Sequence, residues 1–393
     1  MGKSSKDKRD AYYRLAKEQG WRARSAFKLL QLDEEFDLFS DVTRVVDLCA
    51  APGSWSQVLS RVLIKGERFG RAAWEDKQAR MRQNILEITL PTGEEKQELK
   101  EPELKPKKDV KIVAIDLQPM SPLQGIITLR ADITHPATVP LLLSALDSSY
   151  DPKSLSQQAS NPVDLVISDG APDVTGLHDL DIYVQSQLLF AALNLALCVL
   201  RPGGKFVAKI FRGRNVDLLF AQLKIFFERV VVSKPRSSRA SSVEAFIVCL
   251  NFQPPEGFKA SMEDPMGVGD RLSKMVETAV SQEPIVSTSY LQDSEGTWSK
   301  NRVNTTTQRE DGIWEAKLAT YEAESRKSGR WIAPFLACGD LSGYDADASY
   351  HLPKDRVTLD PVQPPTAPPY KRALEMRKAA GGAYGKTTTG KYE

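Results

Sequence analysis

The central part of the chain predicts an α/β fold, a mostly parallel, doubly wound sheet with helices on both faces. Between residues 42 and 250, short β-branched runs alternate with longer segments of helical periodicity. The runs are apolar along their whole length, which is typical of strands that are buried on both faces. Such an alternation builds a parallel sheet, because each helix carries the chain back across a face of the sheet.

The expected elements follow one another in a regular order. Helices are expected at 55–64, 182–200 and 216–229, and Asn215 is a suitable N-cap for the last of them. That helix and the residue after it carry one apolar stripe, formed by Leu219, Leu223, Phe226 and Val230. The expected strands are 43–47, 111–116, 126–129, 163–167, 205–209, 230–232 and 243–248.

Length and composition exclude several classes of protein. The chain has 393 residues, a formal net charge of +2 and 41% hydrophobic residues, as ordinary globular proteins do. Its longest apolar stretch, 188–200, is shorter than the ~20 residues that cross a bilayer, so no membrane association is expected. The first ten residues lack the apolar segment of a secretory signal, and a cytoplasmic location is expected. Four scattered cysteines favour free thiols, and three scattered histidines predict no metal site.

Positive charge is concentrated near the start of the chain. Residues 1–30 contain nine basic and three acidic side chains, which gives a local charge of +6. The aromatic residues Tyr12, Tyr13, Trp21 and Phe27 lie among them, and cations with aromatic rings suit a phosphate backbone and exposed bases. This segment therefore indicates RNA binding. The alternative is a solvated basic helix whose aromatic side chains lie in the core.

The pattern divides the chain into three expected parts. They are a basic helical RNA-binding segment at 1–40, a central domain at 41–252, and a partly ordered extension at 253–393 that ends in disorder. Two polar interruptions of the central domain, at 66–110 and 147–162, are expected to loop out of the sheet. Further basic islands run from 234 to 239 and from 371 to 391.

A ligand site is expected where the strands end. Gly53 lies in a small-residue loop between a strand and a helix, where a ligand can approach the backbone. The acids Asp116, Asp132 and Asp169 each lie at or just beyond a strand end, and ligands of open α/β sheets bind at that rim. Three carboxylates suit a nucleoside better than a pyrophosphate, and the pattern G-x-G-x-x-G of nicotinamide-binding loops is missing. The alternative is that the loop containing Gly53 is a plain turn without a ligand.

Three charged residues stand in apolar surroundings. Lys28 lies in an apolar helical run, Lys209 in an apolar strand, and Glu244 at the start of another strand. Charges are costly to bury unless they are paired, and together with Asp169 these residues form a balanced set that needs no metal. A lysine that is desolvated or close to another cation loses its proton more easily, so it can act as a base. Taken singly, each residue could instead lie at an edge with its charge in solvent.

These residues lie in motifs that resemble the FtsJ-like, or RrmJ-like, RNA 2′-O-ribose methyltransferases, which use S-adenosyl-L-methionine. The resemblance covers about residues 8–252. It rests on SAFKL at 25–29, DLCAAPGSW at 47–55, SDGAP at 168–172, RPGG at 201–204, VAKIF at 207–211 and SVEAF at 242–246.

The resemblance implies a Rossmann-like methyltransferase fold and a role for each site residue. The family's catalytic tetrad falls on Lys28, Asp169, Lys209 and Glu244. In this interpretation Lys209 is the base or orients the ribose hydroxyl, Lys28 lowers the pKa of Lys209 and holds a phosphate, and the two acids fix the ammonium groups. Gly53, Trp55, Asp116, Asp132 and Asp169 would contact the cofactor, with Asp116 near its ribose or methionine and Asp132 near its adenine.

Two further segments, 12–24 and 332–344, resemble the eukaryotic cytoplasmic tRNA branch of this family. That branch methylates the first anticodon nucleotide and the loop nucleotide two before it, in heterodimers with auxiliary proteins that select the nucleotide. Alternatives are ribosomal RNA or capped mRNA as the substrate, or an RNA-binding subunit without catalysis. A nicotinamide oxidoreductase is disfavoured, because no hydride-transfer residue can be located.

Overall fold

The computed structural model describes most of the central domain and parts of both ends. The described residues are 10–70, 73, 78, 106–147, 150, 163–172, 177–213, 216–263, 288–292, 296–302, 306–308, 314–316, 332–340, 343–352, 357, 359–360 and 362. Most of the two expected insertions, Asn215 and the basic island at 371–391 lie outside them.

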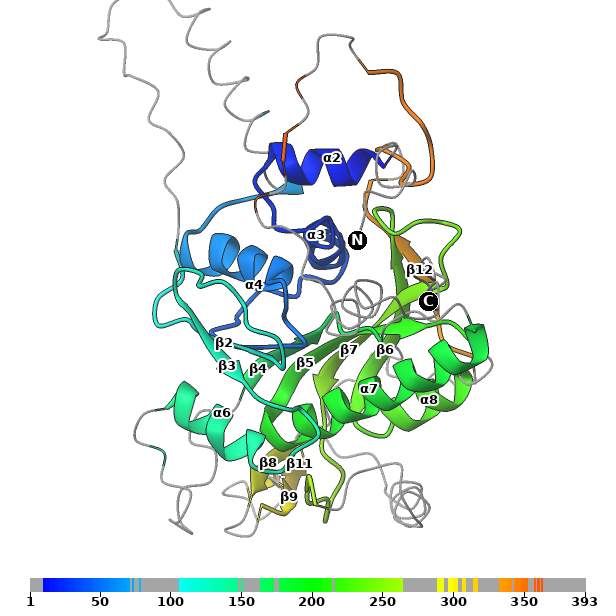
Figure 1. Ribbon diagram of the computed structural model, residues 1–393. Coiled ribbons are helices and arrows are strands. Elements are labelled where there is room, and N and C mark those ends of the chain that lie inside the picture. The colour runs from blue at the N-terminus through cyan, green and yellow to red at the C-terminus, as the bar shows by residue number, and fades with distance from the viewer. Residues whose placement is uncertain are drawn as a thin grey trace, which may run out of the picture.

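One eight-stranded sheet forms the centre of the molecule (Figure 1). Its strands occur in the order β12-β6-β7-β5-β4-β1-β2-β3, and β7 pairs with β5 and β6 in antiparallel fashion while the other pairs are parallel. This confirms the mostly parallel α/β sheet. The bounds are β1 Arg44–Leu48, β2 Lys111–Asp116, β3 Ile126–Arg130, β4 Val163–Ser168, β5 Leu200–Phe211, β6 Phe227–Pro235, β7 Glu244–Phe252 and β12 Phe335–Cys338.

Helices cover both faces of the sheet (Figure 1). On one face lie α2 (Ala11–Glu18), α3 (Ala26–Phe36) and α4 (Ser54–Leu59), which continues into a π-helical turn at Ser60–Ile64. On the other lie α6 (Thr138–Leu146), α7 (His178–Val199) and α8 (Val216–Leu223). Successive strand side chains point to opposite faces, so Phe246 belongs to the core under α3 and Ile247 to the core under α7.

Helix α7 explains why the longest apolar stretch is not by itself a sign of a membrane span. Residues Asp179–Val199 are long and apolar enough to cross a bilayer by length and composition. Along the second half of the helix, however, Ala192, Leu195 and Ala196 are fully buried in the core beside the sheet. Apolar helices of this kind are expected in the core of a protein of this size.

The N-terminal aromatic residues lie largely inside the molecule, which favours the alternative interpretation of the basic segment. Tyr12, Trp21 and Phe27 are buried and contact one another's rings or those of neighbours, so they are not free to stack on bases. Only Tyr13 is half-buried, with the Lys17 ammonium 4.7 Å from its ring centroid. Of the described basic residues in this segment, Lys28 is buried and the others, Arg14, Lys17, Arg22 and Arg24, are half-buried, while the rings stabilise the core.

Several boundaries differ from those expected: α7, β5 and β6 each begin three to five residues early, and the largest departures concern α8 and β12. Helix α8 ends at Leu223, six residues before the expected end, because Phe226 and Val230 turn inward through a loop and a strand instead of along one helix. Strand β12 comes from the expected C-terminal extension and pairs in parallel with β6, so part of the extension completes the sheet.

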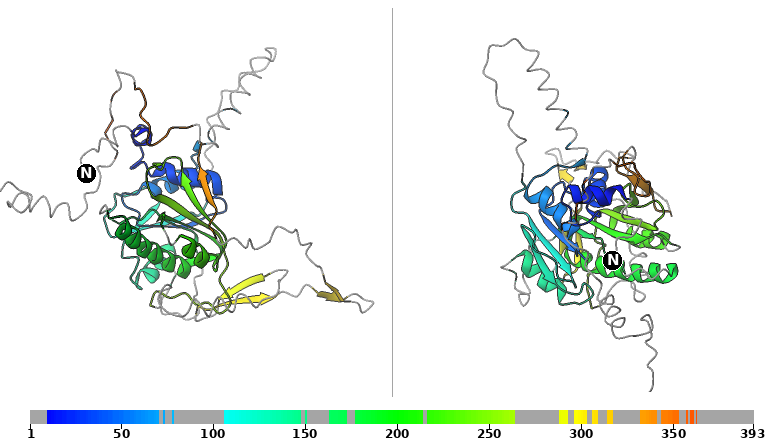
Figure 2. Two further views of the ribbon diagram at one scale, coloured as in Figure 1. Left: turned by 90° about the vertical axis from the view of Figure 1, so that its right-hand side faces the viewer. Right: turned by 45° about the horizontal axis from the view of Figure 1, so that its top comes forward.

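Smaller pairs of strands stand apart from the sheet. Strands β8 (Thr288–Gln292) and β9 (Trp298–Arg302) form one pair, and β10 (Thr306–Gln308) and β11 (Trp314–Ala316) another. Figure 2 shows them at the periphery, where the buried Trp298 joins β9 to the core.

Candidate active site

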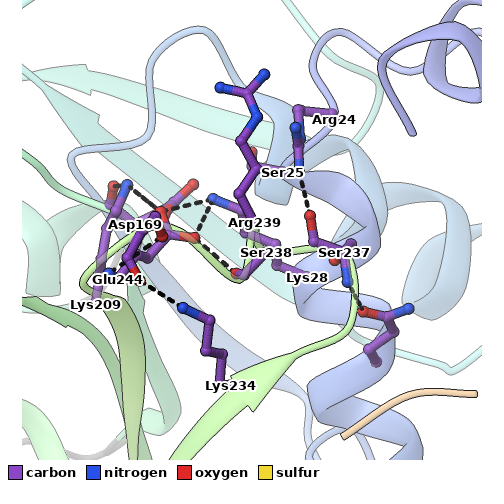
Figure 3. Close-up of polar contacts among 12 residues, drawn as sticks. Arg24, Ser25, Lys28, Asp169, Lys209, Lys234, Ser237, Ser238, Arg239 and Glu244 are labelled. Atoms are coloured by element: carbon purple, nitrogen blue, oxygen red, sulfur yellow. Dashed lines mark hydrogen bonds and ion pairs between the residues drawn. The ribbon is translucent and has the colours of Figure 1, made fainter. Parts of the chain in front are cut away.

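Four charged residues from distant parts of the chain meet at one end of the sheet (Figure 3). Lys28 lies in the first turn of α3, and Asp169 directly follows β4. Lys209 lies on β5, where the neighbouring β4 reaches its last residue, Ser168, opposite Ala208. Glu244 begins β7 opposite Phe211, two residues along from Lys209. The parallel pairing of β4 with β5 and the antiparallel pairing of β5 with β7 therefore bring three of the four residues together. Helix α3 supplies the fourth.

The carboxylate of Glu244 is the centre of this cluster. Its Oε1 and Oε2 lie 2.7 and 2.8 Å from the Lys28 ammonium, and its Oε2 lies 3.3 Å from that of Lys209. Lys209 Nζ also lies 3.1 Å from Asp169 Oδ1. All four side chains are largely buried, so the charges are paired where water cannot compensate for a missing partner.

Burial and charge shift the pKa values of the cluster in different directions. Burial alone would raise the pKa of Glu244, but Lys28 and Lys209 outweigh it and hold the pKa of this carboxyl far below its usual range. Burial lowers the pKa of Lys28, aided by Lys209 and opposed by Glu244. Burial would also lower the pKa of Lys209, but Asp169 and Glu244 raise it above the usual lysine range.

This differs from the expected division of roles between the lysines. Lys28 was expected to lower the pKa of Lys209, but the net pKa of Lys209 is raised, because two carboxylates contact it, whereas Glu244 is the one carboxylate that contacts Lys28 among the described residues. The more weakly neutralised lysine is therefore the one whose proton is held less tightly.

The loop after β1 forms the second part of the site. Gly53 has a positive φ of 94°, and a Cβ there would lie 2.5 Å from Arg22 Nη1 and from Met120 Sδ, so only glycine fits. Asp116, at the end of β2, accepts the Ala51 N–H at 2.9 Å and thereby holds the loop. Trp55 lies behind the loop in the core, where its indole N–H donates to Ser25 O at 3.0 Å.

Asp132 occupies the outer end of this rim. It follows β3, is exposed, and accepts both the N–H and the hydroxyl of Thr134, at 2.8 and 2.7 Å. These hydrogen bonds lower the pKa of Asp132. Asp169 takes part in both regions, because it follows β4 beside β1 and contacts Lys209.

One acid at this rim was not singled out from the sequence, although it lies in the motif at 47–55. Asp47 on β1 is fully buried; Ser56 donates to its Oδ2 at 2.6 Å, and its Oδ1 has no hydrogen-bond partner among the described residues. Burial raises the pKa of Asp47 to about 7, with Asp169 and Asp116 adding to the effect and Ser56 opposing it. A buried carboxyl with an unused oxygen suits a ligand that brings a donor or a positive charge.

A second unforeseen residue joins the strands that carry the catalytic candidates. Gln185 on α7 is buried, and its Nε2 donates to Gly170 O at 3.0 Å and to Lys209 O at 2.9 Å. It thereby links the backbone of Lys209 to that of Gly170, the residue after Asp169, and helps to fix the spacing between Asp169 and Lys209. Its polarity is a weak sequence signal, because the first half of α7 also contains Asp179, Ser186 and Gln187.

The arrangement suits transfer chemistry without a metal. Among the described residues no group of three or more histidine, cysteine or acidic side chains could hold a metal ion. The cluster instead offers two ammonium groups held by carboxylates, beside a rim of carboxylates suited to a cationic, hydroxyl-rich ligand.

Comparisons with known proteins agree with this geometry. Residues 21–252 match the FtsJ-like methyltransferase family. A tRNA (cytidine(32)/guanosine(34)-2′-O)-methyltransferase of Schizosaccharomyces pombe is 48% identical over 379 residues, covering 96% of this chain and 98% of the relative. A human protein of the same name is 44% identical over 382 residues, covering 96% and 86%. A Gallus gallus pre-rRNA 2′-O-ribose methyltransferase is 33% identical, but the match covers 67% of this chain and only 26% of the relative. The chain belongs to the FtsJ-like methyltransferase family.

Proposed function

We propose that this chain transfers a methyl group from S-adenosyl-L-methionine to ribose 2′-hydroxyls of tRNA, at nucleotides 32 and 34 of the anticodon loop. The observation that carries the proposal is the cluster of Lys28, Asp169, Lys209 and Glu244, closed by contacts of 2.7 to 3.3 Å beside the rim at the strand ends. The choice of substrate is supported by relatives that bear this activity in their names and match nearly the whole chain.

The rim residues fit the proposed methyl donor. The unused Oδ1 of Asp47 and the carboxylates of Asp116 and Asp169 suit its positive charge and hydroxyls, and the backbone at Gly53 would contact the donor if the flexible ends of Arg22 and Met120 moved aside. Asp132 is exposed at the outer end of the rim and would meet a polar edge of the donor's adenine. When bound, the donor supplies an electrophilic methyl group on a sulfonium. The chain then needs to align the ribose and remove one proton.

The residues of the cluster divide this work. Lys209 Nζ, held by Asp169 and Glu244, orients the 2′-oxygen by a hydrogen bond. The positive charge of the donor, when it is bound at the rim, would lower the pKa of Lys209 from its raised value, because like charges repel. A lower pKa would make it easier for Lys209 to accept the hydroxyl proton. The proton of the 2′-hydroxyl would pass to Lys209 Nζ in its neutral form, while Lys28, paired with Glu244, would hold a neighbouring phosphate of the tRNA.

We further propose that auxiliary subunits, present as heterodimers with this chain, select the nucleotide. The support is a set of exposed apolar side chains on the C-terminal segment at 332–344, namely Ile332, Phe335 and Tyr344. Methylation of nucleotide 32 and methylation of nucleotide 34 should then each require a different auxiliary protein, so different fractions of a cell extract should restore the two activities. The proposed place of action is the cytoplasm, which imaging of a fluorescent fusion would test.

Ribosomal RNA is the second candidate substrate, since the Gallus gallus relative carries that activity in its name. Mapping of ribose methylation in a strain that lacks this chain separates the two. Loss confined to tRNA nucleotides 32 and 34 is expected, whereas loss in ribosomal RNA or a capped end would contradict the proposal. Failure of the purified chain to bind S-adenosyl-L-methionine in a calorimetric titration would favour a non-catalytic RNA-binding subunit.

A further inference from the structure

In the loop between β6 and β7, residues 236–243, Ser238 contacts the carboxylate of Glu244, while Ser242 Oγ accepts the backbone N–H of Glu244 at 3.3 Å. Ser238 is 5% exposed, and its hydroxyl donates to Glu244 Oε1 at 2.7 Å (Figure 3). Its neighbour Ser237 is equally inaccessible, but the Ser237 hydroxyl has no hydrogen-bond partner among the described residues. The hydroxyls of these two adjacent buried serines therefore differ in whether they contact Glu244.

The contact matters because of how the Glu244 carboxylate is shared. Lys28 lies 2.7 and 2.8 Å from its two oxygens, while Lys209 lies 3.3 Å from Oε2. A carboxylate that loses the hydroxyl on Oε1 can rotate to pair with Lys28 alone, since that ion pair is shorter. Lys209 would then keep only Asp169 as its carboxylate partner. The Ser238 hydroxyl thus helps to hold the carboxylate where it faces both lysines at once.

The loop that delivers Ser238 is anchored from both ends of the chain. Arg239 lies 3.1 Å from Oδ2 of the buried Asp10, the N-cap of α2. The Arg236 N–H donates to Cys338 O of β12 at 2.8 Å. Asp347 accepts the N–H of Ser241 at 3.0 Å. The position of Ser238 is therefore fixed by α2 and by the C-terminal segment, not by its own loop alone.

We infer that Ser238 is a positioning residue for the proposed methyl transfer, which orients Glu244 between Lys28 and Lys209. The inference rests on the proposed function. It assigns to the serine in this basic loop a task in the chemical step. The opposing view is that the loop contributes only to RNA binding through its arginines, in which case loss of the hydroxyl changes affinity and not turnover.

The test compares Ser238→Ala with Ser237→Ala in the full-length chain. Single-turnover methyl transfer is measured at saturating S-adenosyl-L-methionine and tRNA, with auxiliary fractions added if the chain needs them. Affinity for each ligand and the thermal midpoint are measured in parallel. We expect the rate of Ser238→Ala to fall about tenfold or more, as for a lost hydrogen bond to a charged group, with both affinities within about twofold of the wild type. Ser237→Ala should retain the wild-type rate.

The remaining outcomes each contradict a stated claim. An active wild type together with an equally fast Ser238→Ala variant would overturn the inference alone. Equal losses in the two serine variants would also overturn it, because the effect would then come from loop packing. Weaker tRNA binding at an unchanged rate would assign the hydroxyl to RNA recognition instead. A wild type that transfers no methyl group under any of these conditions would contradict the proposed function and, with it, the role of Ser238.

Discussion

The two parts of the site are built on opposite principles. In the cluster of Lys28, Asp169, Lys209 and Glu244 every charge has an oppositely charged partner within 3.3 Å. At the rim, the buried Asp47 keeps an unused oxygen, and Asp132 is exposed to solvent. The cluster is organised in advance for catalysis, whereas the rim has binding capacity left for a ligand. Removing one partner of a buried ion pair in the cluster should therefore destabilise the protein or slow catalysis. A buried carboxylate oxygen without a partner at the rim should destabilise the protein until a ligand binds.

The largest effect is expected from removing a cation of the cluster. Lys209→Ala should lower the rate of methyl transfer about 10³-fold or more while leaving S-adenosyl-L-methionine and tRNA binding nearly intact, because its ammonium acts on the reacting hydroxyl. Rates and affinities are measured side by side. Lys111→Ala is the matched control, since Lys111 is also a strand lysine but donates to Leu146 O, outside the cluster. Normal turnover by the Lys209 variant would remove the assigned role.

Removing an anion of the cluster should affect stability as well as rate. Glu244→Gln leaves two buried ammonium groups with one carboxylate fewer, so we expect a loss of about 3 kcal/mol in the free energy of unfolding at pH 7. Chemical denaturation of both proteins measures it. A change below about 0.5 kcal/mol would show that the cluster is not preorganised.

The same pair of proteins gives a pH dependence. Because the pKa of Glu244 is far lower in the folded chain than in the unfolded one, its stabilisation is complete above the unfolded pKa of about 4.5 and is lost as the pH falls below it. The wild type should therefore lose stability more steeply than Glu244→Gln between pH 5 and pH 3. Parallel curves would contradict the lowered pKa of Glu244.

At the rim the pH dependence of stability has the opposite sign, because the pKa of the buried acid is raised instead of lowered. The pKa of Asp47 is raised to about 7, so its contribution to stability is present below the unfolded pKa of about 4 and is lost as the pH rises through 7. Asp47→Asn should then be more stable than the wild type by about 1 to 2 kcal/mol at pH 8 but not at pH 4, while its cofactor affinity falls about tenfold. Thermal melts and calorimetric titrations at both pH values check this. Destabilisation at pH 8 would mean that the unused oxygen is already satisfied.

The smallest effect is expected at the outer end of the rim. Asp132→Ala should weaken cofactor binding by about threefold and leave the thermal midpoint unchanged, because the side chain is exposed and its partner, Thr134, is local. A tenfold or larger loss in the same titration would place Asp132 among the main cofactor contacts.

The sequence predicted the cluster better than the rim, and the reason is physical. Lys28, Lys209 and Glu244 are charges in apolar runs, and such misfits are visible without coordinates. Asp47 and Ser238 are ordinary residues in their local sequence. Asp47 is distinguished by an unused oxygen and Ser238 by its hydrogen bond to the Glu244 carboxylate across the β6–β7 loop, and neither can be seen from residue type alone. Gln185 lies between these cases, because its polarity is visible but its two carbonyl partners are not.

The fold shows the same division. Buried strands such as β1 and β4 were predictable from their composition, because both of their faces lie in the core. The burial of Tyr12 and Trp21 was left open, since an amphipathic basic segment can serve the core or a ligand equally well. Strand β12 is short and partly exposed, so its place in the sheet depends on pairing with β6 instead of on a local pattern.

Nucleotide-resolved mapping of ribose methylation in purified tRNA tests the central claim most directly. The tRNA is incubated with S-adenosyl-L-methionine, auxiliary fractions and either the wild type or Lys209→Ala. The proposed function predicts new 2′-O-methyl groups at nucleotides 32 and 34 with the wild type and none with the variant. Methylation at both nucleotides by the variant, or none by the wild type, would contradict it.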